Sequence, residues 1–306
     1  MKCAQSLLLL ALAFLPLSLC QAPGVRLPGP LRHARIKARE PGQGPAKKKD
    51  NKYFHEPGGT DELGHYDARY FKEEVPYDEH RPNLRHLIRS YLTVFRTLGV
   101  ETWLAHGTLL GWWWNGQIMP WDYDLDVQVS STTLYYLGKN YNRTMHEYHY
   151  VNEATGEQQT KTYLLDINPH HVERDRGDGM NVIDARWIDL SNGMFIDITG
   201  LAERDPVRMP GIWSCKNYHR YRTRDLYPMR ESEFEGVPAT IPYSFDRILT
   251  EEYGQKSLVT TEWQGHRWEP ELKEWVKIPE PPAPPPSMDD KEKVEKDKVP
   301  PPNISS

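Results

Sequence analysis

A segment of alternating apolar and polar residues constrains the fold of this 306-residue chain more than any other feature. From Tyr123 to Val129 the two kinds of residue alternate without exception, with Asp124, Asp126 and Gln128 at the polar positions. Successive side chains of a β-strand point to opposite faces. The pattern therefore predicts a strand with one face in the core and two carboxylates on the other.

These two carboxylates favour a metal site. At positions i and i+2 of a strand they lie roughly 6–7 Å apart, and neither has a cationic neighbour in the sequence. A divalent cation that takes oxygens from both relieves their repulsion, and oxygen ligands suit Mg²⁺ or Mn²⁺ with a phosphate-bearing substrate. Asp122 lies just before the strand with the same parity and joins the predicted ligands. The alternative is a solvated sheet face, which is usual for an isolated Asp-x-Asp.

Two flanking segments favour the functional interpretation. Gly107 and Thr108 follow a predicted strand, 100–105, where a glycine admits a phosphate and a helix can begin. Asp197 lies between apolar residues of another predicted strand, 194–199. Two metals held by such carboxylates can polarise a phosphoryl group and activate a hydroxyl. We predict Asp124, Asp126 and Asp197 as catalytic, these three and Asp122 as metal ligands, and Gly107 and Thr108 as substrate-binding.

The pattern along the chain predicts an α+β domain with a small mixed β-sheet flanked by helices. Helices are expected at 82–98, with Pro82 in the first turn, at 108–114, after Ser130 or Ser131, and at 242–254. Strands at 185–190 and 194–199 are joined by the hairpin turn Ser191-Asn192-Gly193. A strand, a Gly-Thr turn, an Asp-x-Asp strand and a lone Asp strand are the layout of the nucleotidyltransferase fold.

The two ends differ in composition from the middle. Residues 1–20 are expected to be a signal peptide or a short anchor, and 21–56 a disordered stem. Residues 57–277 are the expected catalytic domain, and 278–306 a disordered tail rich in Pro, Lys and Glu. We expect the secretory pathway, in the Golgi lumen or secreted. Cys215 alone remains after the leader, which excludes a disulfide scaffold, and the net charge of −5 argues against a nucleic-acid partner.

Two further candidates are basic. Arg186 is predicted to bind a donor phosphate, or alternatively to pair with Asp184 or Asp189. The basic run from Lys216 to Arg224 can hold a diphosphate or can be solvated.

Residues 106–127, from His106-Gly107-Thr108 to Pro120-Trp121-Asp122-Tyr123-Asp124-Leu125-Asp126, resemble the signature of the LicD family. The likeness continues through 181–189, 195–201, 225–229, 234–238 and 249–254, and the Trp pair, Asn115-Gly116 and Gln128 resemble the fungal branch, linked to mannosylphosphorylation of cell-wall glycans. The resemblance implies a nucleotidyltransferase-like fold and a nucleotide-diphospho donor. It places Asp197 in the family motif, and on this resemblance we add Trp121 to the predicted substrate-binding residues.

Three functions remain open at this point. The first is a metal-dependent phosphotransferase that moves a sugar phosphate, with GDP-mannose as one donor, onto a hydroxyl of a glycan or glycoprotein. The second is a glycosyltransferase that uses Asp-x-Asp to bind a nucleotide sugar. The third is a non-catalytic regulator or accessory subunit that works with a partner transferase.

Overall fold

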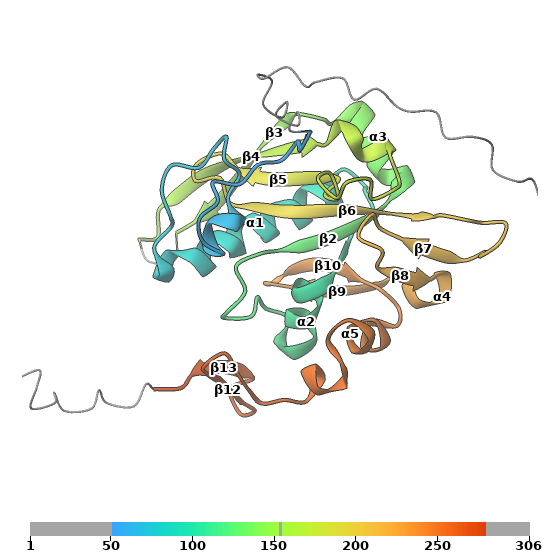
Figure 1. Cartoon of the computed structure of the whole chain (residues 1–306). Helices are drawn as coiled ribbons and strands as arrows, with labels where there is room; N and C mark the ends of the chain where they lie inside the picture. The colour runs from blue at the N-terminus through green and yellow to red at the C-terminus, as the bar shows by residue number, and fades with distance from the viewer. Residues whose placement is uncertain (1–50, 153–154, 280–306) are drawn as a thin grey trace, which may run out of the picture. The chain divides into compact units, whose positions relative to one another are not determined.

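The structure is a computed structural model and describes residues 51–152 and 155–279. The expected leader, most of the expected stem and all but the first two residues of the expected tail lie outside these ranges. The α+β class is confirmed, since helices flank a mixed sheet (Figure 1). None of the described helices is both long and apolar enough to span a bilayer.

The main sheet of the described chain has the strand order β1-β2-β6-β5-β4-β3, and β7 and β8 extend it beyond β6. The β2–β6 pair is parallel and the other pairs are antiparallel. Its strands are β1 (Trp103–Leu104), β2 (Asp126–Ser130), β3 (Thr144–Val151), β4 (Gln158–Ile167), β5 (Ala185–Asp189), β6 (Phe195–Glu203), β7 (Ile212–Ser214) and β8 (Arg220–Arg222).

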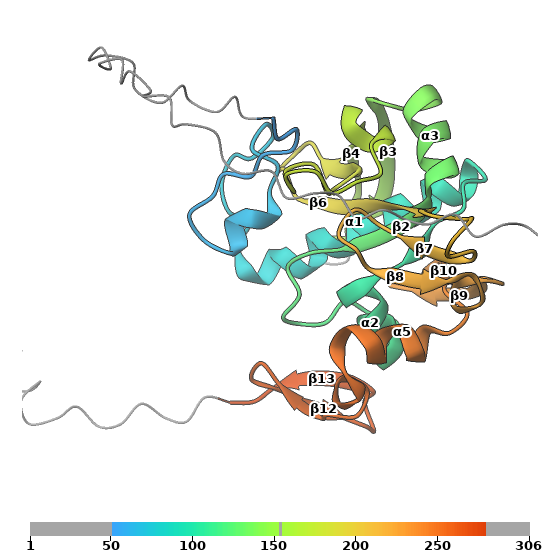
Figure 2. The same cartoon turned by 45° about the vertical axis from the view of Figure 1, so that its right-hand side comes forward.

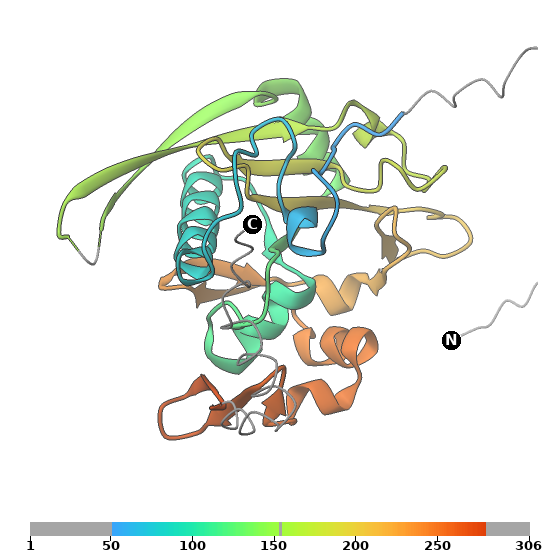
Figure 3. The same ribbon diagram turned by 60° about the vertical axis from the view of Figure 1, so that its left-hand side comes forward.

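Helix α1 (Tyr77–Thr97) covers one face of this sheet (Figure 3). Its apolar residues recur at helical spacing, and the rings of Tyr91 and Phe95 pack edge-on against Trp187 of β5. The helix starts five residues before the expected start at Pro82, which lies inside it. Acidic residues in the first turn favour this earlier start, because they interact with the positive end of the helix dipole.

The opposite face is covered by the segment that leads into α1. Phe54 is 3% exposed, and the Tyr53 hydroxyl donates to Asp166 Oδ1 of β4 at 2.9 Å. The expected end of the stem at residue 56 is therefore too late, since the chain packs on the sheet from Asn51 onward. Two aromatic residues among charged ones gave too weak a pattern to predict this packing.

The predicted strand at 123–129 is shorter than expected. Pairing in β2 begins at Asp126, so Asp124 lies in the irregular segment just before the strand. Gln128, expected on the polar face, is 1% exposed. Its buried side-chain oxygen is satisfied by a hydrogen bond from Trp103 Nε1 at 3.2 Å. Of the predicted strand at 100–105, only β1 is paired.

The remaining helices and small sheets of the described chain include those that form the site beside the start of β2. Figure 2 shows α2 and α5 together, with the C-terminal sheet beside them. These elements are α2 (His106–Asn115), α3 (Ser131–Asn140), α4 (Thr223–Leu226), α5 (Phe245–Tyr253), the short 3-10 helices η1 (Glu62–His65), η2 (Pro169–Val172) and η3 (Gln255–Leu258), the hairpin of β9 (Arg230–Phe234) and β10 (Val237–Ile241), and the sheet of β11 (Glu262–Trp263), β12 (His266–Glu269) and β13 (Glu274–Lys277).

Candidate active site

The parallel pairing of β2 with β6 places two of the predicted aspartates side by side. Asp126 and Asp197 are direct partners in the register. The backbone N–H of Asp126 donates to Thr108 Oγ1 at 2.8 Å, and that of Asp197 donates to the Leu125 carbonyl at 3.0 Å. Helix α2 thus fixes the start of β2, and β2 fixes Asp197.

Three carboxylates precede or begin β2 without a cationic partner. Within the described chain, no donor or cation contacts the side chains of Asp122, Asp124 or Asp126. Burial, reinforced by the charge of Asp124, raises the pKa of Asp122 to about 7. Burial also raises the pKa of Asp126 to about 8; Asp124 and Asp197 add to this effect and His106 opposes it. The fold therefore disfavours the ionised forms of Asp122 and Asp126, as expected of carboxylates that lack a compensating cation.

Asp197 differs from these three because Arg186 holds it. Arg186 Nε donates to Asp197 Oδ1 at 2.9 Å, and its NH2 group donates to Glu56 at 2.6 Å. The guanidinium is 3% exposed and stacks 3.6 Å from the centroid of the Phe195 ring. Burial still raises the pKa of Asp197, although Arg186 lowers it.

A cavity of about 460 Å³ opens over the unpaired carboxylates; we call it the carboxylate cavity. Helix α2, the segment 119–126 and the C-terminal part of the chain form its walls, so residues far apart in sequence meet there. Trp121 lies 5.0 Å from Trp275 between ring centroids. The lining residues are Gly107, Leu110, Trp114, Met119, Trp121, Asp122, Asp124, Asp126, Tyr253, Lys256, Ser257, Thr260, Trp263 and Trp275.

The donor set of the carboxylate cavity fits a hard divalent cation. Carboxylates that lack a cation are the ligands that Mg²⁺ and Mn²⁺ prefer, and Mg²⁺ is often bound by only one or two carboxylates plus phosphate oxygens and water. Among the described residues, no group of three His, Cys, Asp or Glu side chains is gathered closely enough to hold a metal ion alone. Asp122, Asp124 and Asp126 can thus provide part of a coordination shell that a phosphate completes.

The predicted substrate-binding residues divide into two groups. Gly107 and Trp121 line the carboxylate cavity, and a Cβ on Gly107 would lie 3.4 Å from Asp122 Oδ2. Thr108 is 3% exposed and does not line the cavity, because its hydroxyl holds the N–H of Asp126. Arg186 forms ion pairs with Asp197, Glu56 and Asp67, so its guanidinium is not available to bind a phosphate in this arrangement. Its partners are thus not Asp184 or Asp189, the alternatives considered from the sequence.

The basic run from Lys216 to Arg224 does not act as one unit. Lys216 is 1% exposed and bonds to Asp184 Oδ1 at 2.9 Å, so it is structural. His219 and Arg220 instead line a second cavity of about 420 Å³ beside the first.

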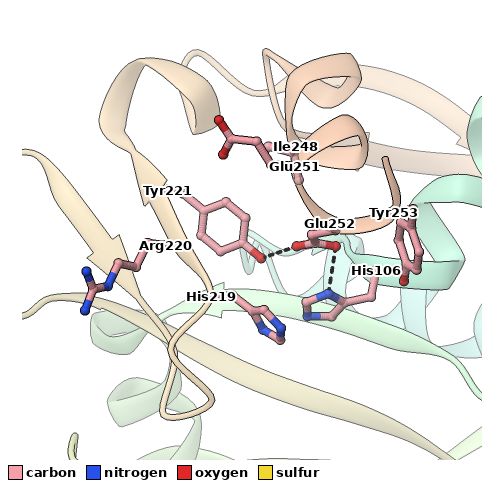
Figure 4. Close-up of a pocket in the computed structure, with 8 residues that line it drawn as sticks. All are labelled: His106, His219, Arg220, Tyr221, Ile248, Glu251, Glu252 and Tyr253. Atoms are coloured by element: carbon pink, nitrogen blue, oxygen red, sulfur yellow. Dashed lines mark hydrogen bonds and ion pairs between the residues drawn. The ribbon is translucent and has the colours of Figure 1, made fainter. Parts of the chain in front are cut away.

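Sequence reasoning missed the pair formed by His106 and Glu252, which lines this second cavity (Figure 4). His106 Nδ1 lies 3.0 Å from Glu252 Oε2, and the Tyr221 hydroxyl donates to Glu252 Oε1 at 2.8 Å. Burial lowers the pKa of His106, but Glu252 and Asp126 raise it more, so the net shift is upward. The two partners are 146 positions apart, and no local pattern joins them.

The comparisons with known proteins agree with this layout. Residues 99–244 match the family described as LicD/FKTN/FKRP, nucleotidyltransferase domain. The chain is 32% identical over 204 residues to mannosyltransferase regulator 4 of Saccharomyces cerevisiae, which is 64% of this chain and 17% of the yeast protein. It is 35% identical over 159 residues to mannosyltransferase regulator 14 of the same yeast, which is 49% of this chain and 16% of that protein.

The matched region contains β1, α2, β2, β5 and β6, and with them all the predicted aspartates. Both yeast relatives agree with the resemblance to the fungal branch. Residues 99–244 of this chain are therefore similar to the nucleotidyltransferase domain of the LicD family.

Proposed function

We propose that this protein is a metal-dependent phosphotransferase that moves a sugar phosphate from a nucleotide-diphospho sugar to a glycan hydroxyl in the secretory pathway. The observation that carries the proposal is the carboxylate cavity. It is lined both by the unpaired carboxylates of Asp122, Asp124 and Asp126 and by aromatic side chains, among them Trp121 and Trp263. A nucleotide-diphospho sugar has the matching parts, a diphosphate that needs a cation and planar or ring groups that stack.

Each part of the cavity has a role in this proposal. Asp124 and Asp126, with Asp122 in support, would hold Mg²⁺ or Mn²⁺, which supplies Lewis-acid polarisation of the phosphoryl oxygens when bound. Asp197, paired with Arg186, is not among the residues that line the cavity, but its register with Asp126 puts the two side chains on the same face of the sheet. Among the lining residues of the described chain, Lys256 carries a positive charge, and in this proposal it would pair with a phosphate oxygen.

The test is transfer by purified protein from a panel of nucleotide donors, with GDP-mannose first. Release of the nucleoside monophosphate, rather than the diphosphate, is the expected product pattern. Asp124→Ala and Asp126→Ala should each lower the transfer rate by about 10²–10³-fold, since each removes a ligand of the cation that would stabilise the developing charge. Glu271→Ala, at an exposed site in the C-terminal segment, is the matched control and should leave the rate unchanged. Full activity in both aspartate variants rules out this mechanism.

A metal-dependent glycosyltransferase is the second candidate, because it also uses paired carboxylates on a nucleotide sugar. The bond that is formed separates the two. A phosphodiester signal in the ³¹P NMR spectrum of the product excludes glycosyl transfer, and its absence from a modified glycan excludes phosphoryl transfer.

The third candidate is a regulator, and the names of the two yeast relatives favour it. A regulator needs no metal and no donor of its own. Transfer by the purified chain without a partner transferase would exclude it. Restoration of transfer only when a partner transferase is added, including with Asp126→Ala, would support it.

A further inference from the structure

The second cavity, of about 420 Å³, adjoins the carboxylate cavity. The two share Tyr253, and their neighbouring residues His106 and Gly107 line one cavity each. Figure 4 shows the side chains of His106, His219, Tyr221 and Glu252 gathered on one side of this second cavity. Its lining is His106, His219, Arg220, Tyr221, Ile248, Glu251, Glu252 and Tyr253. We call it the histidine cavity.

The two cavities differ in chemistry. The carboxylate cavity has apolar aromatic walls and suits a stacking group beside a cation-bound diphosphate. The histidine cavity carries Glu251 and Glu252 together with Arg220 and two imidazoles. Two carboxylates repel a second diphosphate, whereas they accept hydrogen bonds from sugar hydroxyls. The exposed ring of Tyr253, at 44%, offers an apolar face to a pyranose.

The hydrogen-bond network assigns the proton on His106. Gln128 Oε1 accepts from Trp103 Nε1, so the amide nitrogen of Gln128 is the atom that lies 3.4 Å from His106 Nε2. That nitrogen is a donor, and His106 Nε2 is therefore the unprotonated position. The proton is on Nδ1 and faces Glu252. Nε2 receives only this long contact from Gln128, and a hydroxyl bound in the cavity has to replace it as the donor. A histidine held at Nδ1 by a carboxylate can then accept the proton of that hydroxyl at Nε2.

Asp197 is a poor alternative for this task. Its carboxylate is bound by Arg186, which would have to give up an ion pair as Asp197 became protonated. Glu252 is engaged with both His106 and Tyr221. His106 also adopts a φ of +51°, which is uncommon for a residue other than glycine and is found most often at functional sites.

We infer that the histidine cavity binds the acceptor glycan and that His106 takes the proton of the attacking hydroxyl, with Glu252 as a positioning residue. This inference rests on the proposed function. The acceptor oxygen forms a bond to the phosphorus that carries the sugar, and its proton moves to His106 Nε2. The bond from this phosphorus to the bridging oxygen breaks, and the nucleoside monophosphate leaves with the electron pair.

The test compares His106→Asn with wild type. Asparagine tolerates the positive φ of this position and has no basic nitrogen, so the fold should be kept, which thermal unfolding checks. The transfer rate should fall by about 10²–10⁴-fold, the usual contribution of a general base. Binding of GDP with Mn²⁺ should stay within about twofold of wild type, and added imidazole should restore part of the rate of His106→Ala.

Two further variants sharpen the test. Glu252→Gln keeps the shape of the pair but loses its charge, and it should lower kcat by about tenfold or more with little change in the KM of the donor. His149→Ala is the matched control, an exposed histidine on β3 outside both cavities, and should behave as wild type.

The outcomes separate the two proposals. An active wild type with His106→Asn within about threefold of its rate, or with GDP binding lost along with transfer, overturns the role of His106. The absence of imidazole rescue has the same meaning. A wild type that transfers from no donor contradicts the proposed function instead.

Discussion

At the scale of single residues, neighbouring aspartates in one motif have different surroundings. Asp126 is tied by its backbone to Thr108 and by its register to Asp197, whereas Asp124 is exposed in the segment before β2. Asp197 forms an ion pair with Arg186. Residue type alone could predict the set but not this division, because it depends on side chains contributed by β5 and by the segment before α1.

The raised pKa of Asp126 leads to a prediction about pH and stability. Without metal, its pKa of about 8 lies above the value in the unfolded chain, so the folded state binds the proton more tightly. The free energy of unfolding therefore falls as the pH rises from about 4, where the unfolded carboxyl ionises, and the destabilisation is complete above about pH 8. Asp126→Asn should therefore raise the free energy of unfolding of the metal-free protein by at least about 1 kcal/mol at high pH.

Chemical unfolding at about pH 9 and about pH 5 measures this difference. The stabilisation by Asp126→Asn should be much smaller at the lower pH, where Asp126 of the folded wild type is protonated, and should vanish only below about pH 4. An equal effect at both pH values would show that the charge of Asp126 is not its cause.

At the scale of elements, hydrophobic periodicity predicted the amphipathic helices and strands and missed strands that have no buried face. The helix at 108–114, the capping of α3 by Ser130 and the hairpin at 191–193 are confirmed as α2, α3 and the β5–β6 turn. Strand β3 has no buried residue and gave no apolar signal, although residues 163–167 of its partner β4 are buried. The β11–β13 sheet, with its three tryptophans, was likewise missed because its strands are only two to four residues long.

The β11–β13 sheet contributes two tryptophans to the carboxylate cavity in different ways. Trp263 is 58% exposed, whereas Trp275 is 8% exposed and packs on Trp114 and Trp121. Trp263→Ala should weaken binding of GDP with Mn²⁺ by about tenfold with no loss of stability, since stacking one base on an aromatic ring contributes roughly 1–3 kcal/mol. Trp263→Phe should keep most of the affinity.

Calorimetric titration of GDP and thermal unfolding check this pair of claims. Trp275→Ala is the contrasting variant and should lower stability by about 3–5 kcal/mol, as expected when a buried Trp is truncated. Unchanged GDP affinity in Trp263→Ala would remove the small sheet from the donor site.

At the scale of the whole described domain, the fold brings two cavities together beside the pair of Asp126 and Asp197. The sequence predicted the carboxylates and the two residues Gly107 and Trp121 that line the first cavity with them. It could not predict the walls, because α5, η3 and the β11–β13 sheet reach the site through contacts more than 100 residues from the motif. The yeast relatives extend far beyond the part that this chain matches, so their names do not decide whether this domain is catalytic.

The measurement that tests the central claim most directly is a calorimetric titration of GDP into the purified protein, with and without Mn²⁺. We expect GDP to bind at least about tenfold more tightly with Mn²⁺, because the cation would join the diphosphate to Asp124 and Asp126. Asp126→Ala should remove this dependence, and Glu271→Ala should keep it. GDP binding that is equal with and without Mn²⁺, or a dependence that survives in Asp126→Ala, would contradict a metal-dependent donor site at these carboxylates.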